Sequence, residues 1–190
     1  MKDAMLCRRM FLKSSAFFAA TLLGAKSAFA RMVDGAGTGS LTEGKLSLYN
    51  VNCNERLTVT YRNSLGEYCD EALQALNWIF RCHHTNQTTK MDLRVVEYLN
   101  RLDNTLGGDN EIHIISGYRS PEYNAELRRR SKGVAKDSLH MKGMAIDLAI
   151  PRFGLDRIRK GALTLAAGGV GYYPQSGFVH IDSGHFRTWG

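Results

Sequence analysis

The chain has 190 residues, the length of one ordinary domain, and its 25 basic and 18 acidic residues give a formal net charge of +7. The first 30 residues contain five of the basic residues and one acidic residue, which leaves 20 and 17 and a net charge of +3 for the rest. Most of the basic excess therefore belongs to the N-terminal segment. The charge gives no support for nucleic-acid binding, and we expect no nucleic-acid partner.

Residues 1–30 are predicted to be a twin-arginine signal peptide. Adjacent arginines at 8–9 precede an apolar stretch at 16–25 and a small-x-small cleavage motif at 28–30. The apolar stretch is too short and too rich in Ala, Ser and Gly for a membrane span, although an uncleaved anchor is the alternative. We expect cleavage after Ala30, export to the periplasm by the twin-arginine (Tat) translocation machinery, and no stable membrane span afterwards.

The rest of the chain is predicted to be a flexible leader at 31–44, rich in Gly, Ser and Thr, and one domain at 45–190. Alternating apolar residues predict strands, and apolar residues at the helical period predict helices. The expected strands are 45–51, 56–61, 111–116, 144–150, 170–173 and 178–181. The expected helices are 69–83, 92–106, 120–130 and 156–167, the third with Ser120 as its N-cap and Pro121 in its first turn. This order predicts an α+β fold, with a small, mostly antiparallel sheet flanked by helices.

Three cysteines, Cys53, Cys69 and Cys82, follow the predicted cleavage site. Their spacings match no CxxC-type metal motif. Two interpretations stay open: one disulfide formed in the oxidising periplasm, or Cys69 and Cys82 as small buried residues of a helical segment.

A histidine and an aspartate seven positions apart form the first candidate for chemistry. His140 ends a loop, and Asp147 lies within the expected strand 144–150. Strand alternation places Ala145 and Asp147 on one face and the apolar residues on the other. A carboxylate in the middle of such a strand needs a partner or a cation, because burying it alone is costly. A surface histidine beside a salt-bridged aspartate is the alternative.

A second histidine occurs in the last expected strand. Alternation places His180 and Asp182 on one face, while Val179 and Ile181 point to the core. His140, Asp147 and His180 would give zinc three N/O ligands and leave the fourth tetrahedral position to water, which is typical of catalytic sites. A core histidine with satisfied hydrogen bonds is the alternative.

An arginine follows the expected strand 111–116, in the motif Ser116-Gly117-Tyr118-Arg119-Ser120. The planar fork of Arg119 can hold a carboxylate or a polarised carbonyl oxygen, although arginines at helix starts are also common on surfaces.

Together these motifs, with Gly-Val-Gly-Tyr-Tyr-Pro before the last strand, resemble the D-alanyl-D-alanine-type metallopeptidases of the M15 clan. The similarity spans about residues 46–189 and is greatest to a twin-arginine-exported branch of murein endopeptidases. It implies a fold shared with these peptidases and the hedgehog domain, zinc (Zn2+) bound by His140, Asp147 and His180, and substrate held by Arg119 with Tyr118. The implied partner is peptidoglycan, and the implied activity is hydrolysis of its meso-diaminopimelate peptide cross-links, with a preference for the 3–3 type.

This chain differs from the wider clan at the positions that supply the general base. Many relatives place a Glu three residues, or a His two residues, before the last ligand, where this chain has Gly177 and Phe178. Asp182 is the first candidate for the catalytic base and His185 the second, while Asp182 would serve equally well to orient an imidazole N–H. Two other functions stay open: a D,D-carboxypeptidase, and a non-catalytic peptidoglycan-binding module.

Overall fold

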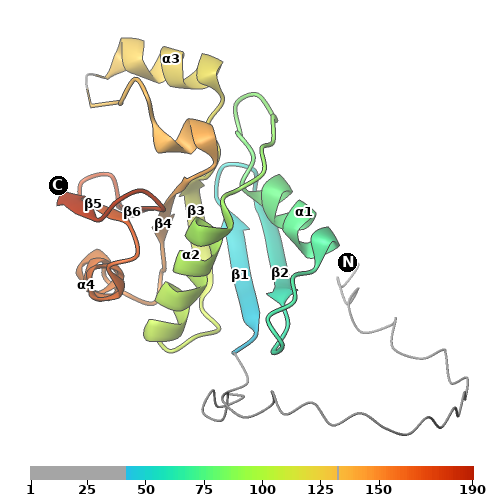
Figure 1. Ribbon diagram of the computed structural model, residues 1–190. Helices are drawn as coiled ribbons and strands as arrows, with labels where there is room; N and C mark the ends of the chain where they lie inside the picture. The colour runs from blue at the N-terminus through green and yellow to red at the C-terminus, as the bar shows by residue number, and fades with distance from the viewer. Residues whose placement is uncertain (1–41, 132) are drawn as a thin grey trace, which may run out of the picture.

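The computed structural model describes residues 42–131 and 133–190, so the predicted signal peptide and most of the predicted leader lie outside the described residues. One seven-stranded sheet runs through this part of the chain, and helices pack against it (Figure 1). The strands are β1 (Gly44–Asn50), β2 (Glu55–Arg62), β3 (Glu111–Ser116), β4 (Ala145–Ala149), β5 (Gly169–Tyr173), β6 (Phe178–Asp182) and β7 (Arg187–Trp189). The helices are α1 (Asp70–Ile79), α2 (Leu93–Thr105), α3 (Pro121–Arg130), α4 (Leu155–Leu165) and the short 3-10 helix η1 (Leu139–Lys142).

The strand order is β2-β1-β3-β4-β6-β5-β7. The pairs β1–β2, β3–β4, β4–β6 and β5–β6 are antiparallel, whereas β1–β3 and β5–β7 are parallel. The expectation of an α+β fold with a mostly antiparallel sheet is therefore confirmed. The edge strand β7 was not predicted, because three residues, Arg-Thr-Trp, are too few to show an alternating pattern.

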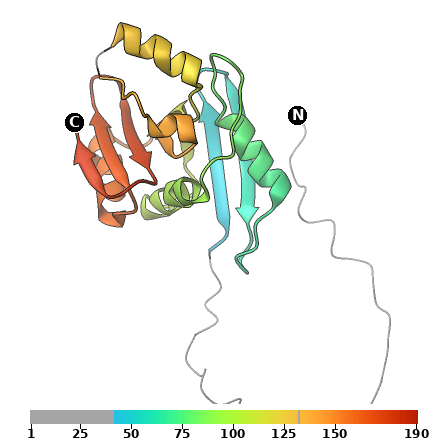
Figure 2. The same cartoon turned by 45° about the horizontal axis from the view of Figure 1, so that its top comes forward.

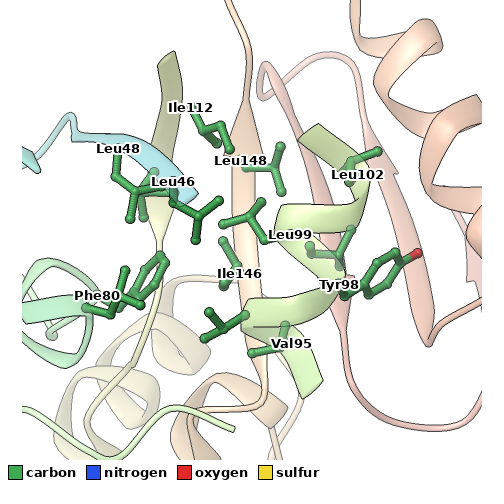
Figure 3. Packing of buried hydrophobic residues seen from close by; sticks show 14 of the residues in the cluster. Leu46, Leu48, Phe80, Val95, Tyr98, Leu99, Leu102, Ile112, Ile146 and Leu148 are labelled. Carbon is green, nitrogen blue, oxygen red and sulfur yellow. The ribbon is translucent and has the colours of Figure 1, made fainter. Parts of the chain in front are cut away.

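The core lies between the sheet and the helices. Ile146 and Leu148 of β4 are fully buried and lie beside Leu99 and Leu102 of α2 in Figure 3. Helices α1 and α4 contribute to the same apolar cluster. Because successive side chains of a strand point to opposite faces, the apolar residues of β4 and β6 leave their polar neighbours on the face away from this core.

Helix α3 and the short helix η1 lie at the same end of the molecule in both views (Figures 1 and 2). Helix α3 begins as predicted: the Ser120 hydroxyl accepts a hydrogen bond from the Tyr123 N–H at 3.2 Å, and Pro121 occupies the first turn. This cap fixes the end of the segment that carries Tyr118 and Arg119.

Among the described residues, no helix is long and apolar enough to cross a membrane. Of the cysteines, Cys82 is buried, Cys53 is half-buried, and the half-buried Cys69 lies 3.4 Å from a carboxylate oxygen of Glu71.

Candidate active site

His140 is placed by the tight turn that follows it. Helix η1 ends at Gly143, whose φ of 65° is a left-handed conformation that glycine adopts without strain. The ring is buried, and its Nδ1 lies 2.8 Å from the Gly117 carbonyl oxygen, to which it can only donate. A neutral ring that donates from Nδ1 presents Nε2 as its free lone pair. Nε2 is therefore the atom of His140 that can bind a metal.

Asp147 and His180 face each other across neighbouring strands. They are direct partners in the antiparallel pairing of β4 and β6, and Asp147 Oδ1 lies 2.8 Å from His180 Nδ1. His140 Nε2 lies 3.2 Å from His180 Nδ1 and 3.3 Å from Asp147 Oδ1. The structure thus brings together three buried side chains that the sequence separates by up to 40 positions.

The three donor atoms fit the demands of a zinc ion. Zinc bonds of about 2.0–2.1 Å in a tetrahedral arrangement separate the ligand atoms by about 3.3 Å. Two of the three separations, 3.2 and 3.3 Å, match this value, and the third, 2.8 Å, is shorter. Two imidazoles and one carboxylate also form a donor set that zinc prefers. His140, Asp147 and His180 therefore form a cluster that could hold a metal ion.

The electrostatics of the cluster favour a cation. Burial alone would raise the pKa of Asp147, but His140 and His180 outweigh it and hold this pKa below its ordinary value. Burial would likewise lower the pKa of His180, but Asp147 and Asp182 raise it overall. A divalent ion between the three side chains would supply the positive charge that these carboxylates attract.

Asp182 lies on the far side of the His180 ring from Asp147. Its Oδ2 is 3.1 Å from His180 Nε2 and 2.7 Å from Arg187 Nη2. Its Oδ1 accepts from Arg187 Nη1 at 3.0 Å and from the Gly184 N–H at 2.8 Å. The side chain is 0% exposed. The pKa of Asp182 lies below its ordinary value, since its bonds to His180, Arg187 and Gly184 outweigh the effect of burial.

Arg119 borders the cluster. Its backbone N–H donates to the His140 carbonyl oxygen at 3.2 Å, and its Nη2 lies 3.8 Å from Asp147 Oδ2. Its Nη1 lies 3.4 Å from Asn124 Oδ1, while the buried Nε has no hydrogen-bond partner among the described residues. A buried donor of this kind is costly to leave unpaired.

Tyr118 and His185 occupy different surroundings. The Tyr118 side chain is partly buried against the core, and burial raises its pKa. Its N–H donates to the Phe80 carbonyl oxygen at 2.7 Å. His185 is exposed in the turn between β6 and β7, and within residues 42–131 and 133–190 no hydrogen bond or ion pair joins its ring to the cluster.

Sequence reasoning did not find Arg187 and Trp189, both on β7. The Trp189 ring centroid lies 5.2 Å from that of His180, and its Nε1 donates to the Tyr173 hydroxyl at 2.7 Å. A signal was present in Gly169 and Gly171, because glycines inside a strand often mark a close approach of another group. An added Cβ at Gly171 would lie 2.7 Å from the Trp189 ring.

A model of the family described as peptidoglycan L,D-endopeptidase MepK matches residues 40–189. The chain belongs to this family. The peptidoglycan L,D-endopeptidase MepK of Escherichia coli K12 is 45% identical over 144 residues, which cover 76% of this chain and 79% of the relative. A probable peptidoglycan L,D-endopeptidase MepK from Haemophilus influenzae is 42% identical over 145 residues, which cover 76% of this chain and 77% of the relative. The resemblance to M15-clan peptidases is thereby confirmed. The residues matched by the family model include the buried cluster of His140, Asp147 and His180.

Proposed function

We propose that this MepK-family chain is a zinc-dependent endopeptidase that hydrolyses L,D peptide cross-links in peptidoglycan. The observation that carries the proposal is the convergence of three buried donor atoms, His140 Nε2, Asp147 Oδ1 and His180 Nδ1, within 3.3 Å of one another. The names of the relatives supply the substrate class, and the 3–3 meso-diaminopimelate link is the L,D bond that we propose.

In this proposal His140, Asp147 and His180 hold the metal, and each has a fixed orientation. The Gly117 carbonyl holds the His140 ring, and the β4–β6 pairing holds the other two ligands opposite each other. A bound zinc ion would lower the pKa of a water molecule and polarise the scissile carbonyl. Ligands placed on a strand pair and a short helix are held more firmly than ligands on a loop.

Arg119 is proposed to bind the substrate. Its Nη2 lies only 3.8 Å from Oδ2 of Asp147, a proposed metal ligand, so the guanidinium lies beside the metal position. A guanidinium there can hold a substrate carboxylate or the oxyanion that forms during hydrolysis. Tyr118, the residue before Arg119, is proposed as a minor substrate contact.

Of the two roles open to Asp182, the contacts support orientation of His180. Both of its oxygens already accept hydrogen bonds, and the side chain is fully buried. A general base needs a free lone pair within reach of the water. His185 is exposed and is therefore the residue to test as the base.

The predicted location is the periplasm, reached through the Tat machinery. Residues 1–30 support this route by their adjacent arginines and apolar stretch, and peptidoglycan in the names of the relatives supports the destination.

The test is a digest of purified peptidoglycan, read by chromatography and mass spectrometry. We expect the protein to remove L,D cross-linked dimers, a chelator to abolish this activity, and zinc to restore it. His140→Ala should retain no zinc and cleave nothing, whereas Arg56→Gln, on the distant strand β2, should behave as wild type. His185→Gln should cleave more slowly if His185 is the base.

The other two functions give different results. Release of free D-alanine from an uncross-linked pentapeptide, with dimers left intact, would indicate a carboxypeptidase. Binding of peptidoglycan without any cleavage at any metal concentration would indicate a non-catalytic module and would refute the proposal.

A further inference from the structure

The C-terminal strand β7 places an arginine against the buried carboxylate behind His180. Arg187 contacts Asp182 with both of its terminal nitrogens, at 3.0 Å to Oδ1 and 2.7 Å to Oδ2. This bidentate arrangement is the strongest geometry that an arginine and a carboxylate can adopt. Asp182 Oδ2 in turn lies 3.1 Å from His180 Nε2. A chain of contacts thus runs from Arg187, on the edge strand β7, through Asp182 to His180 in the cluster of proposed metal ligands.

The neighbouring strand makes room for this contact. An added Cβ at Gly169 of β5 would overlap Asp182 Oδ2 and Arg187 Nη1 and would lie 2.9 Å from Arg187 Cζ. The Gly169 N–H also donates to Asp182 Oδ1 at 3.2 Å. The parallel pairing of β5 with β7 sets Gly169 directly opposite Arg187. Asp182 on one side and Gly169 on the other therefore fix the position of the Arg187 side chain.

We infer that Arg187, acting through Asp182, is a positioning residue that fixes the orientation and tautomer of His180, so that β7 is part of the metal centre. This inference rests on the proposed function, because it assumes that His180 binds zinc.

The physical reason lies in the two nitrogens of the imidazole ring. The nitrogen that binds a metal is set by the hydrogen bond that the other nitrogen makes. Asp182 accepts from Nε2, which leaves Nδ1 as the atom that faces Asp147 and His140. A buried carboxylate without a cation would be costly. Arg187 supplies the missing charge without touching the metal ligands, and its fork also fixes the plane of the carboxylate.

The Trp189 ring packs beside the His180 ring. Its centroid lies 5.2 Å from the imidazole, and its Nε1 is anchored on the Tyr173 hydroxyl at 2.7 Å. Two of the three residues of β7 therefore contact either the imidazole ring or its carboxylate partner, and the third, Thr188, is exposed.

The experiment compares Arg187→Gln, Arg187→Lys and Asp182→Asn with a matched control, Arg56→Gln. Arg56 also pairs with a carboxylate, Glu111 at 3.0 Å, but on the exposed opposite edge of the sheet. Zinc affinity is measured by competition with a chromophoric chelator. The His180 tautomer of the zinc-loaded protein is read from long-range proton–nitrogen NMR.

We expect Arg187→Gln and Asp182→Asn to weaken zinc binding by about 10–100-fold, the usual effect of removing an outer partner of a metal ligand. Arg56→Gln should change it by less than about twofold, because exposed ion pairs contribute little. Wild-type His180 should carry its proton on Nε2, and the Arg187→Gln spectrum should show a second form of the ring.

Wild-type zinc affinity and a single unchanged tautomer in Arg187→Gln would overturn the inference. If Arg187→Gln does not fold, as judged by circular dichroism without metal, Arg187→Lys decides. It keeps the charge but loses the fork, and unchanged affinity there would also overturn the inference. If the wild type binds no zinc, or binds it equally well after His140→Ala, the proposed metal centre itself is wrong. The two failures are therefore distinguishable.

Discussion

Gly169→Ala adds one methyl group to a residue that is not itself a proposed metal ligand, and we expect it to disturb the metal centre. The new Cβ would overlap atoms of both Asp182 and Arg187 and lie 2.9 Å from Arg187 Cζ, whereas carbon atoms in contact prefer about 3.5–4.0 Å. Overpacking of this kind costs about 1–3 kcal/mol. It is opposed by about 0.4–1 kcal/mol, because alanine reduces the entropy of the unfolded chain.

The matched control is Gly154→Ala at the start of α4, where no heavy atom lies within 4 Å of an added Cβ. It makes the same change in the unfolded chain without the overlap, but Gly154 is the N-cap of α4, where alanine is less favourable than glycine by about 0.5–1 kcal/mol. We therefore expect Gly169→Ala to be less stable than Gly154→Ala by about 0.5–2 kcal/mol, and each kcal/mol lowers Tm by about 2–4 °C in a chain of this size.

The assay is thermal unfolding in the presence of a chelator, followed by zinc titration of both variants. Only Gly169→Ala should also bind zinc more weakly, because the overlap displaces Asp182 from His180 Nε2. Equal Tm and equal zinc affinity in the two variants would refute the steric reasoning and the coupling of β5 to the metal centre.

Three further predictions concern the fold. Leu99→Ala removes a fully buried side chain and should lower the free energy of unfolding by about 2–5 kcal/mol, seen as a lower urea midpoint at unchanged slope; an unchanged midpoint contradicts it. Tyr98→Phe removes a hydroxyl that donates to a carbonyl of α4 at 2.9 Å and should cost about 0.5–1.5 kcal/mol in the same assay, and a variant as stable as wild type would argue against this bond. Asp92 caps α2, and Arg94, followed by the Ser183 hydroxyl, holds its pKa below the ordinary value against burial. The contribution of the Asp92 carboxylate to stability is present above about pH 4, its unfolded pKa, and is lost as pH falls through the lower folded pKa. The difference in unfolding free energy between wild type and Asp92→Ala should therefore be smaller at pH 3 than at pH 6, and equal differences at the two pH values would contradict this prediction.

The sequence predicted much of the local structure because its signals are local. Alternation over five residues places Asp147 on one face of β4 and His180 with Asp182 on one face of β6, whatever these strands pair with. The Ser120 cap likewise depends only on residues within one helical turn. The motifs that carry the family resemblance could thus be found in the sequence, and with them the residues proposed to bind the metal.

Tertiary structure alone decided which atoms of these residues meet. The order of the strands brings Asp147 opposite His180, and the Gly117 carbonyl selects Nε2 of His140. No sequence period encodes these choices, because each depends on groups more than 20 positions apart.

The role of Asp182 was open in the sequence for the same reason. As a carboxylate two residues from a histidine it could accept a proton from water or orient the ring, and its spacing suits both. The partner that supports the orienting role, Arg187, lies on a three-residue edge strand that has no pattern of its own and pairs with β5. Local periodicity determines which face a side chain occupies, whereas its partners are determined by strands that pair across the folded sheet.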